Sequence, residues 1–257
     1  MSELRATGRL PVHPQHPHPV MASTLREDDS VGSLSSAQRE AVSEIWLGRA
    51  QGELSTAAVF EQVAEAAREL AAAPVVLSLV ARACRDEVRH AQFCHELAEL
   101  YAGRCLPCPN AAVFETPRFG QAPPEVNRHL LLVYQSCLNE GIAVAYLQEN
   151  HRLVHAAAAR QVIHELLCDD LLHARIGWAH LASPTLSAAA RRHIAAALPT
   201  LLRLAREAWL GLGVGPDLDC PEHGCLGRSR HPAIVNAAIE ELILPGLATV
   251  TSGIKVR

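Results

Sequence analysis

Two stretches of the sequence, "DEVRHA" at 86–91 and "DDLLHA" at 169–174, place acidic residues and a histidine in the same order. Residues three apart on a helix lie on one face, one turn apart, so the second acid and the histidine of each stretch point the same way. Carboxylate oxygen and imidazole nitrogen together suit a transition-metal ion. Each stretch therefore predicts half of a metal site. The four side chains concerned are Glu87, His90, Asp170 and His173.

One further carboxylate precedes each motif at a similar distance. Glu53 in "QGELSTAAVF" lies 34 residues before Glu87, and Glu140 in "CLNEGIAVAYL" lies 30 residues before Asp170. The two spacings differ by four residues, about one helical turn, so the two halves keep the same register. Glu61 is the alternative to Glu53, because it stands at a more even distance from the expected turn between the first two helices. The small neighbours of Glu53 favour it, since they leave room beside its carboxylate.

This set of side chains has a charge that needs a partner. Four carboxylates and two imidazoles are costly to bury alone. Two divalent iron or manganese ions would balance the charge and accept mixed oxygen and nitrogen ligands. One Glu-x-x-His pair is common on solvated helix faces, but two copies with matched neighbours, each preceded by a carboxylate, are far more specific. The pattern therefore favours a metal pair over a purely structural polar network.

The elements that must position these residues are helices. A capping box is expected at the start of the first helix, with Ser35 or Ser36 as N-cap and Glu40 as its partner. Pro- and Gly-bearing segments at 103–123 and 211–232 are expected to be connections. Two long helices, a long crossover and two more long helices predict an all-α four-helix bundle with additional C-terminal helices. The expected helices cover 37–72, 75–101, 124–152, 156–182, 186–211 and 233–243.

Composition supports this fold and limits the function. Of the 257 residues, 49% are hydrophobic but only 4% are aromatic, a balance that favours helices over strands. With a net charge of -4 and no basic block, we expect no nucleic-acid partner. No apolar run suggests a membrane span and no secretory signal is recognisable, so we expect a soluble cytoplasmic protein without a membrane partner.

We expect a flexible Pro/His-rich tail at 1–34 and one helical domain at 35–257. Within the domain, the bundle core covers 37–182 and a C-terminal helical extension covers 185–257. In the tail, "HPQHPH" could collect metal ions through His13, His16 and His18, but a solvated Pro-rich segment is the favoured interpretation.

On these motifs the chain resembles the ferritin-like superfamily of di-iron carboxylate proteins over about residues 37–182. "DEVRHA" also looks like the Asp-Glu-x-Arg-His form found in bacterial multicomponent monooxygenases. The resemblance implies a four-helix bundle that holds two irons bridged by carboxylates, and a reduced site that reacts with dioxygen. The chain departs from the pattern twice, with Asp170 in place of Glu and Leu172 where an Arg would match Arg89.

Carried over to this chain, the resemblance assigns roles to individual residues. Glu87 and Asp170 would be the bridging carboxylates. Asp86 and Asp169 would accept hydrogen bonds from the ligand histidines, and Arg89 would pair with one of these acids. One iron would be held by Glu53, Glu87 and His90, and the other by Glu140, Asp170 and His173.

Other polar residues are weaker candidates. His180, two turns beyond His173, is expected to be a hydrogen-bonded interior histidine, and Tyr134 and Tyr146 are expected to belong to the core. Two cysteine-bearing loops, "CLPC" and "CPEHGC", suit a zinc site only if the fold brings them together, and disulfides are less expected in a reducing cytosol. The zinc candidates are Cys105, Cys108, Cys220, His223 and Cys225.

The function predicted from the sequence is an O2-activating oxidoreductase with two irons, or manganese in place of one or both. An oxygenase, N-oxygenase or desaturase would act on a small organic substrate and need an electron donor, with a homodimer as one expected assembly. The alternatives are an iron-binding ferroxidase of the same class and a metal-free helical interaction module.

Overall fold

Helices make up almost all of the described chain. The structure is a computed structural model that describes residues 28–110, 119, 122–211 and 215–251. Within these ranges there is no strand, and one isolated β-bridge joins Cys220 and Cys225. The all-α prediction is therefore confirmed. The histidines of "HPQHPH" lie outside the described residues. The main helices are α2 (Ser36–Glu69), α3 (Pro74–Ala102), α4 (Pro124–Leu132), α5 (Glu140–Leu153), α6 (Ala157–Ala182), α7 (Ala188–Gly211), α8 (His231–Ala237) and α9 (Leu244–Thr251).

Two helix junctions depart from a regular α-helix. The π-helical segment η2 (Val133–Asn139) joins α4 to α5, so the single helix expected at 124–152 contains a local widening. A second π-helical segment, η5 (Ala238–Ile243), joins α8 to α9. Such insertions are rare in helices and frequent at functional sites. The first of them ends directly before Glu140.

The helix ends follow the expected signals with one correction. The side chain of Ser35 accepts from the Gln38 backbone N–H at 3.3 Å, and Gln38 accepts from the Ser35 N–H at 3.0 Å. The capping-box partner is thus Gln38, because it is the third helical residue, whereas the expected Glu40 accepts from exposed Arg104. Helix α3 starts at a proline, and Gly103 ends it in the left-handed conformation with φ 65°.

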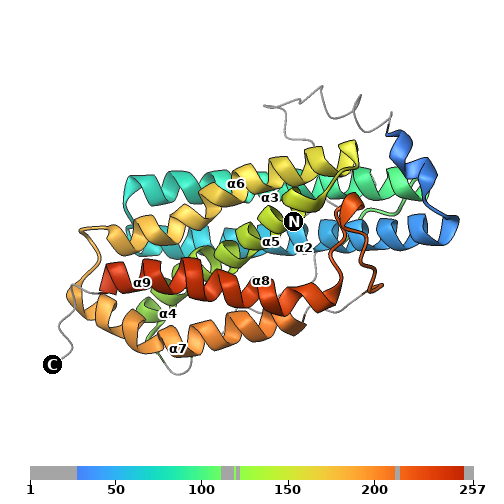
Figure 1. Ribbon diagram of the computed structural model, residues 1–257. Coiled ribbons are helices and arrows are strands. Elements are labelled where there is room, and N and C mark those ends of the chain that lie inside the picture. Colours follow the sequence, from blue (N-terminus) through green and yellow to red (C-terminus); the bar gives the residue numbers. More distant parts are fainter. Residues whose placement is uncertain (1–27, 111–118, 120–121, 212–214, 252–257) are drawn as a thin grey trace.

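Four helical rods pack side by side in a closed ring. Helix α2 packs on α3, α3 on α6, α6 on η2 and α5, and α4 on α2 (Figure 1). The long connection between α3 and α4 is the crossover. Within each hairpin the two consecutive helices pack against each other, α2 against α3 and α5 against α6. Helices α7, α8 and η5 pack on the outer side of the α4–η2–α5 rod, so the C-terminal third forms a second layer.

The core is divided by a polar layer. One hydrophobic cluster includes Phe60, Val80 and Ile176, and the other includes Trp46, Leu97 and Ile163. Along α2, α3 and α6 the residues between these two clusters are the predicted metal ligands. The polar layer therefore lies in the middle of the bundle, with apolar packing at both ends.

Residues 28–34 pack against the helical domain, although the sequence predicted a flexible tail at 1–34. A short 3₁₀ helix, η1 (Asp29–Ser33), carries Val31 into the second hydrophobic cluster. Asp28 caps it and also accepts from the Ala158 backbone N–H at 2.8 Å, which fixes this segment to the start of α6. A buried valine and a shared carboxylate outweigh the polar composition of this stretch.

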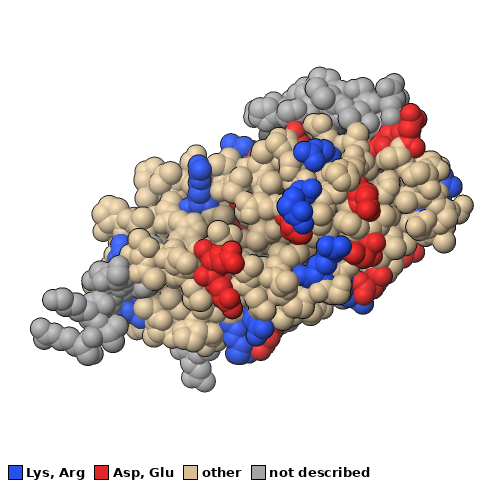
Figure 2. Space-filling model, viewed as in Figure 1, with Lys and Arg blue, Asp and Glu red and all other residues tan. Residues whose placement is uncertain are grey.

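The longest apolar helical run lies inside the bundle. The helical run Pro124–Leu153 is long and apolar enough to cross a membrane, but 72% of its most apolar window is buried inside the structure. Burial of this kind is expected for a core helix. On the face shown in Figure 2, basic and acidic residues are interspersed and most of the surface is uncharged.

Candidate metal centre

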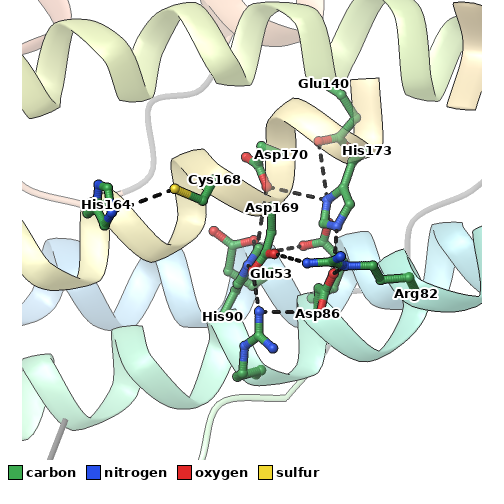
Figure 3. Close-up of polar contacts among 12 residues, drawn as sticks. Glu53, Arg82, Asp86, His90, Glu140, His164, Cys168, Asp169, Asp170 and His173 are labelled. Atoms are coloured by element: carbon green, nitrogen blue, oxygen red, sulfur yellow. Dashed lines mark hydrogen bonds and ion pairs between the residues drawn. The ribbon is translucent and has the colours of Figure 1, made fainter. Parts of the chain in front are cut away.

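The structure brings all six predicted ligands together from four helices. Their donor atoms form two groups within which every atom lies within 4.8 Å of the others. Five of them are labelled in Figure 3, which shows Glu53, His90, Glu140, Asp170 and His173 gathered in one place within the bundle. One group is Glu53, Glu87 and His90, and the other is Glu87, Glu140, Asp170 and His173.

Two carboxylates lie between the two imidazoles. Glu87 is 2.9 Å from His173 Nδ1 and 3.6 Å from His90 Nδ1. Asp170 Oδ1 is 3.4 Å from His173 Nδ1 and 3.8 Å from His90 Nδ1. Each therefore reaches both halves of the cluster, which is what a bridging ligand must do. The shorter side chain of Asp170 does not prevent this reach.

The two outer carboxylates each serve one half. Glu53 lies 3.9 Å from His90 Nδ1, and Glu140 lies 3.9 Å from His173 Nδ1. The Glu53 side chain is 22% exposed, whereas those of the other five ligands are at most 10% exposed. The cluster is thus closest to solvent on the side of α2. Glu61, the alternative, is exposed and belongs to neither group.

The outer nitrogen of each histidine is held by an aspartate from the other motif. His90 Nε2 lies 3.2 Å from Asp169, and His173 Nε2 lies 3.3 Å from Asp86. Because α3 and α6 are antiparallel neighbours, the aspartate of one helix reaches the histidine of the other. A carboxylate at Nε2 fixes the tautomer that leaves Nδ1 free as an acceptor.

Two arginines neutralise these aspartates. Arg89 forms an ion pair with Asp169 and lies 3.3 Å from Asp86. Arg82 also bridges the pair, at 3.1 Å from Asp86 and 2.9 Å from Asp169. Sequence reasoning missed Arg82, although it stands one turn before Asp86 on the same helix face. Arg82 supplies the second guanidinium, which is missing at position 172 because a leucine stands there in place of an arginine.

The atoms that face the centre of the cluster make no regular hydrogen bond. His90 Nδ1, His173 Nδ1 and Glu87 Oε1 are buried, and within the described residues their nearest polar neighbours are one another and the other acids of the cluster, with Glu87 Oε1 2.9 Å from His173 Nδ1. Buried polar atoms are rarely left unsatisfied in native proteins. Nitrogen and oxygen donors that converge in this way fit a transition-metal pair such as iron or manganese.

In the metal-free protein, several groups of the cluster have raised pKa values and so favour their protonated forms. Burial would lower the pKa of His90, but Asp169 and Glu87 raise it to about 10. Burial, together with the charge of Glu87, raises the pKa of Glu53, and burial with the charge of Asp170 raises that of Glu140. Burial opposes ionisation of Glu87, yet the two imidazoles hold its pKa well below the usual range. The cluster therefore attracts positive charge strongly.

Close packing sets the position of Glu140. Gln135, inside η2, donates to Glu140 Oε1 at 2.8 Å. The widened helix lies against Gly177 of α6, where a β-carbon would come within 2.9 Å of the Cys137 backbone nitrogen. Glycine at this position thus permits the approach of the rod that carries Glu140.

The weaker candidates lie outside the cluster. His180 is buried and its Nε2 lies 2.9 Å from His129 Nδ1, so it belongs to a separate histidine pair. Burial and the neighbouring His129 lower its pKa to about 4. Tyr134 packs against Phe119, and Tyr146 accepts from Arg49 at 3.0 Å.

The cysteine-bearing loops do not form a common donor group. All eight cysteines lie in the described residues and all are free thiols. Neither group of metal-donor atoms found in the described chain contains a cysteine. His223 Nδ1 instead lies 2.8 Å from the Tyr101 hydroxyl. The zinc hypothesis for Cys105, Cys108, Cys220, His223 and Cys225 therefore gains no support from this arrangement.

Comparison of the chain with protein-family models, with curated proteins and with solved structures gives no match. What the site can do is therefore argued from its own residues.

Proposed function

We propose that this chain is a ferritin-like di-iron protein that activates dioxygen as an oxygenase, N-oxygenase or desaturase on a small organic substrate. The observation that carries the proposal is the convergence of four carboxylates and two imidazoles, in which both Nδ1 atoms face the carboxylates without a regular hydrogen bond and both Nε2 atoms are held by aspartates. A Glu from each of two helices and a carboxylate-x-x-His motif from each of the other two is the ligand pattern of di-iron bundles.

The donors divide into two half-sites that share carboxylates. Glu53 and His90 would bind one ion, and Glu140 and His173 the other, with Glu87 and Asp170 between them. Four carboxylates carry four negative charges, which two divalent cations cancel. Iron fits this oxygen and nitrogen donor set, and manganese fits it as well.

Bound reduced iron would supply the reaction with dioxygen, and the chain supplies the surroundings. The two hydrophobic clusters exclude water above and below the polar layer. The partly exposed Glu53 marks the side from which a small substrate would approach. An external electron donor would be needed to return the site to its reduced state.

A ferroxidase without an organic substrate is the second candidate, because Fe(II) held by the same donors would be oxidised by dioxygen. The second layer formed by α7, α8 and η5 argues against a minimal storage bundle, since it covers one outer rod of the ring. A metal-free interaction module is the third candidate. It offers no reason for converging donor atoms that make no regular hydrogen bond.

The deciding experiment measures metal content per chain after aerobic purification with iron supplied. The wild type is expected to hold about two irons, following the ligand pattern. A Glu87→Ala/His90→Ala variant that folds by circular dichroism should lose most of it, and a Glu61→Ala control should not. No transition metal in the wild type, even after anaerobic Fe(II) reconstitution, would overturn the proposal.

Oxygen stoichiometry separates the first two candidates. For an oxygenase, the reduced protein should consume dioxygen faster with a reductant and a suitable substrate, and the substrate should be hydroxylated, N-oxygenated or desaturated. For a ferroxidase, added Fe(II) should be oxidised over many turnovers and accumulate as ferric product without any organic substrate.

A further inference from the structure

The sequence "CPEHGC" at 220–225 forms a small closed hairpin. The Cys220 N–H donates to the Cys225 carbonyl at 2.8 Å, and the Cys225 N–H donates to the Cys220 carbonyl at 3.1 Å. Residues that exchange both hydrogen bonds form a directly opposed antiparallel pair with Cα atoms about 5.5 Å apart. Disulfides need Cα atoms between roughly 4.4 and 6.8 Å apart. The Cα spacing expected for such a pair therefore falls within the disulfide range, and rotation of the two side chains would have to bring the sulfurs together.

The hairpin is held in this conformation by its surroundings. His223 Nδ1 lies 2.8 Å from the Tyr101 hydroxyl, and the His223 carbonyl accepts from Trp46 at 3.2 Å. The Glu222 carbonyl accepts from two backbone N–H groups at the α5–α6 turn, each at 2.9 Å. Gly224, at φ 77°, allows the tight turn and the close approach to Trp46. These contacts fix the two cysteines opposite each other without help from their sulfurs.

The two thiols differ in accessibility. Cys225 is fully buried and Cys220 is 8% exposed, so an oxidant meets Cys220 first. Burial raises the pKa of the Cys225 thiol to about 12 and also raises that of Cys220. Both thiols are therefore protonated at neutral pH, and their oxidation should be slow and should speed up as pH rises.

We propose that Cys220 and Cys225 form a reversible disulfide that closes this hairpin and locks the contact between α2, α3 and the α5–α6 turn. With glutathione disulfide as oxidant, the Cys220 thiolate attacks one sulfur and releases one glutathione. The Cys225 thiolate then attacks the Cys220 sulfur and releases the second glutathione. Two thiols lose two electrons and two protons, and one glutathione disulfide becomes two glutathione thiols. This proposal is independent of the metal centre.

Stabilisation is the expected consequence of oxidation. Closing a loop of this size restricts the unfolded chain, and the backbone bridge already places the two cysteines opposite each other. For a domain of this size we expect the thermal midpoint to rise by about 5 °C. Cys220→Ser and Cys225→Ser should each abolish the rise, because either removes one sulfur of the bond. Cys105→Ser/Cys108→Ser should preserve it, since that pair belongs to a different loop.

The test uses the full-length protein incubated with glutathione disulfide at pH 8.5, alkylated without reduction and mapped by peptide mass spectrometry. A Cys220–Cys225 link that dithiothreitol removes, together with the shift in thermal midpoint, is the expected result. Three results would overturn the proposal: a stable glutathione adduct on Cys220, a link from either cysteine to a third one, or two unmodified thiols after prolonged incubation. The peptide map of the wild-type protein tests the proposal even if a serine variant fails to fold.

Discussion

Replacing Asp169 by Asn should weaken metal binding at the half-site of His90, although Asp169 lies in the other motif. Asp169 holds His90 Nε2 at 3.2 Å, whereas His173 is held by Asp86 at 3.3 Å. Outer-layer partners of metal-bound histidines are worth roughly 10- to 100-fold in affinity. That range corresponds to about 1.4–2.7 kcal/mol. In the Asp169→Asn variant, the metal affinity of the His90 half-site should therefore fall by this factor, while that of the His173 half-site stays close to the wild-type value.

Anaerobic Co(II) titration followed by visible absorption measures the two affinities separately. Asp219→Asn is the matched control, because Asp219 also pairs with an arginine but lies on the surface away from the cluster. Circular dichroism and the thermal midpoint of the metal-free protein check that each variant folds. The control should leave both affinities unchanged.

A double-mutant cycle tests the crossed arrangement directly. In a His90→Ala background, Asp169→Asn should have little further effect on the remaining site, because the aspartate acts through the missing imidazole. In the same background, Asp86→Asn should weaken the remaining site by the full factor. If Asp169→Asn alone leaves both affinities within twofold of the wild type, or if the two double variants behave alike, the reasoning is wrong.

Four further predictions concern the ligands, the protons and the packing. Glu53→Gln should lower metal content, whereas Glu61→Gln should not; equal loss in both would refute the choice of Glu53. Loading metal at pH 7 should release more than two protons per chain, measured calorimetrically in two buffers, because cations replace the protons of the cluster; release of less than one would contradict this. Without metal, the raised pKa of His90 gives stability that is present below pH about 6.5 and lost as pH rises through about 10, measurable as a falling thermal midpoint. Gly177→Ala should destabilise the protein by about 1–3 kcal/mol in urea unfolding, because its β-carbon would meet the Cys137 backbone, whereas Gly52→Ala has open space and should be neutral or stabilising.

The converging set of acids and histidines was predictable from the sequence because each of these residues lies on a helix. Helical periodicity converts spacing into direction, so a carboxylate and a histidine three residues apart point the same way wherever the helix lies. The spacing of Glu53 and Glu140 from their motifs then predicted which residues meet across each hairpin. The boundaries of the long helices were predicted to within a few residues for the same reason, with Ser35, Pro74 and Gly103 as the signals. The last helix was predicted too short, since the helix expected at 233–243 continues through α9 to Thr251.

What the sequence left open depends on contacts between helices. The exchange of aspartates between motifs follows from the antiparallel register of α3 and α6, which no local pattern reveals. The π-helical segment before Glu140 comes with the close approach of Gly177 to Cys137, a contact between residues 40 positions apart. Arg82 could have been found, since an arginine four residues before Asp86 lies on the same face. The packing of residues 28–34 on the domain could not be predicted, because it depends on the contact between Asp28 and the start of α6.

The distribution of arginines favours the proposed metal centre over a structural polar network. The outer layer of two aspartates contains one guanidinium for each carboxylate, Arg82 and Arg89, so it is neutral by itself. The inner layer contains four carboxylates, and within the described chain no Lys or Arg nitrogen lies within 4.0 Å of any of them. A network built only for stability would use fixed cations, as the outer layer does. The inner layer instead depends on protons or on bound ions, and in the metal-free protein His90 Nδ1, His173 Nδ1 and Glu87 Oε1 make no regular hydrogen bond. Exchangeable divalent cations satisfy the charge and the donor atoms together.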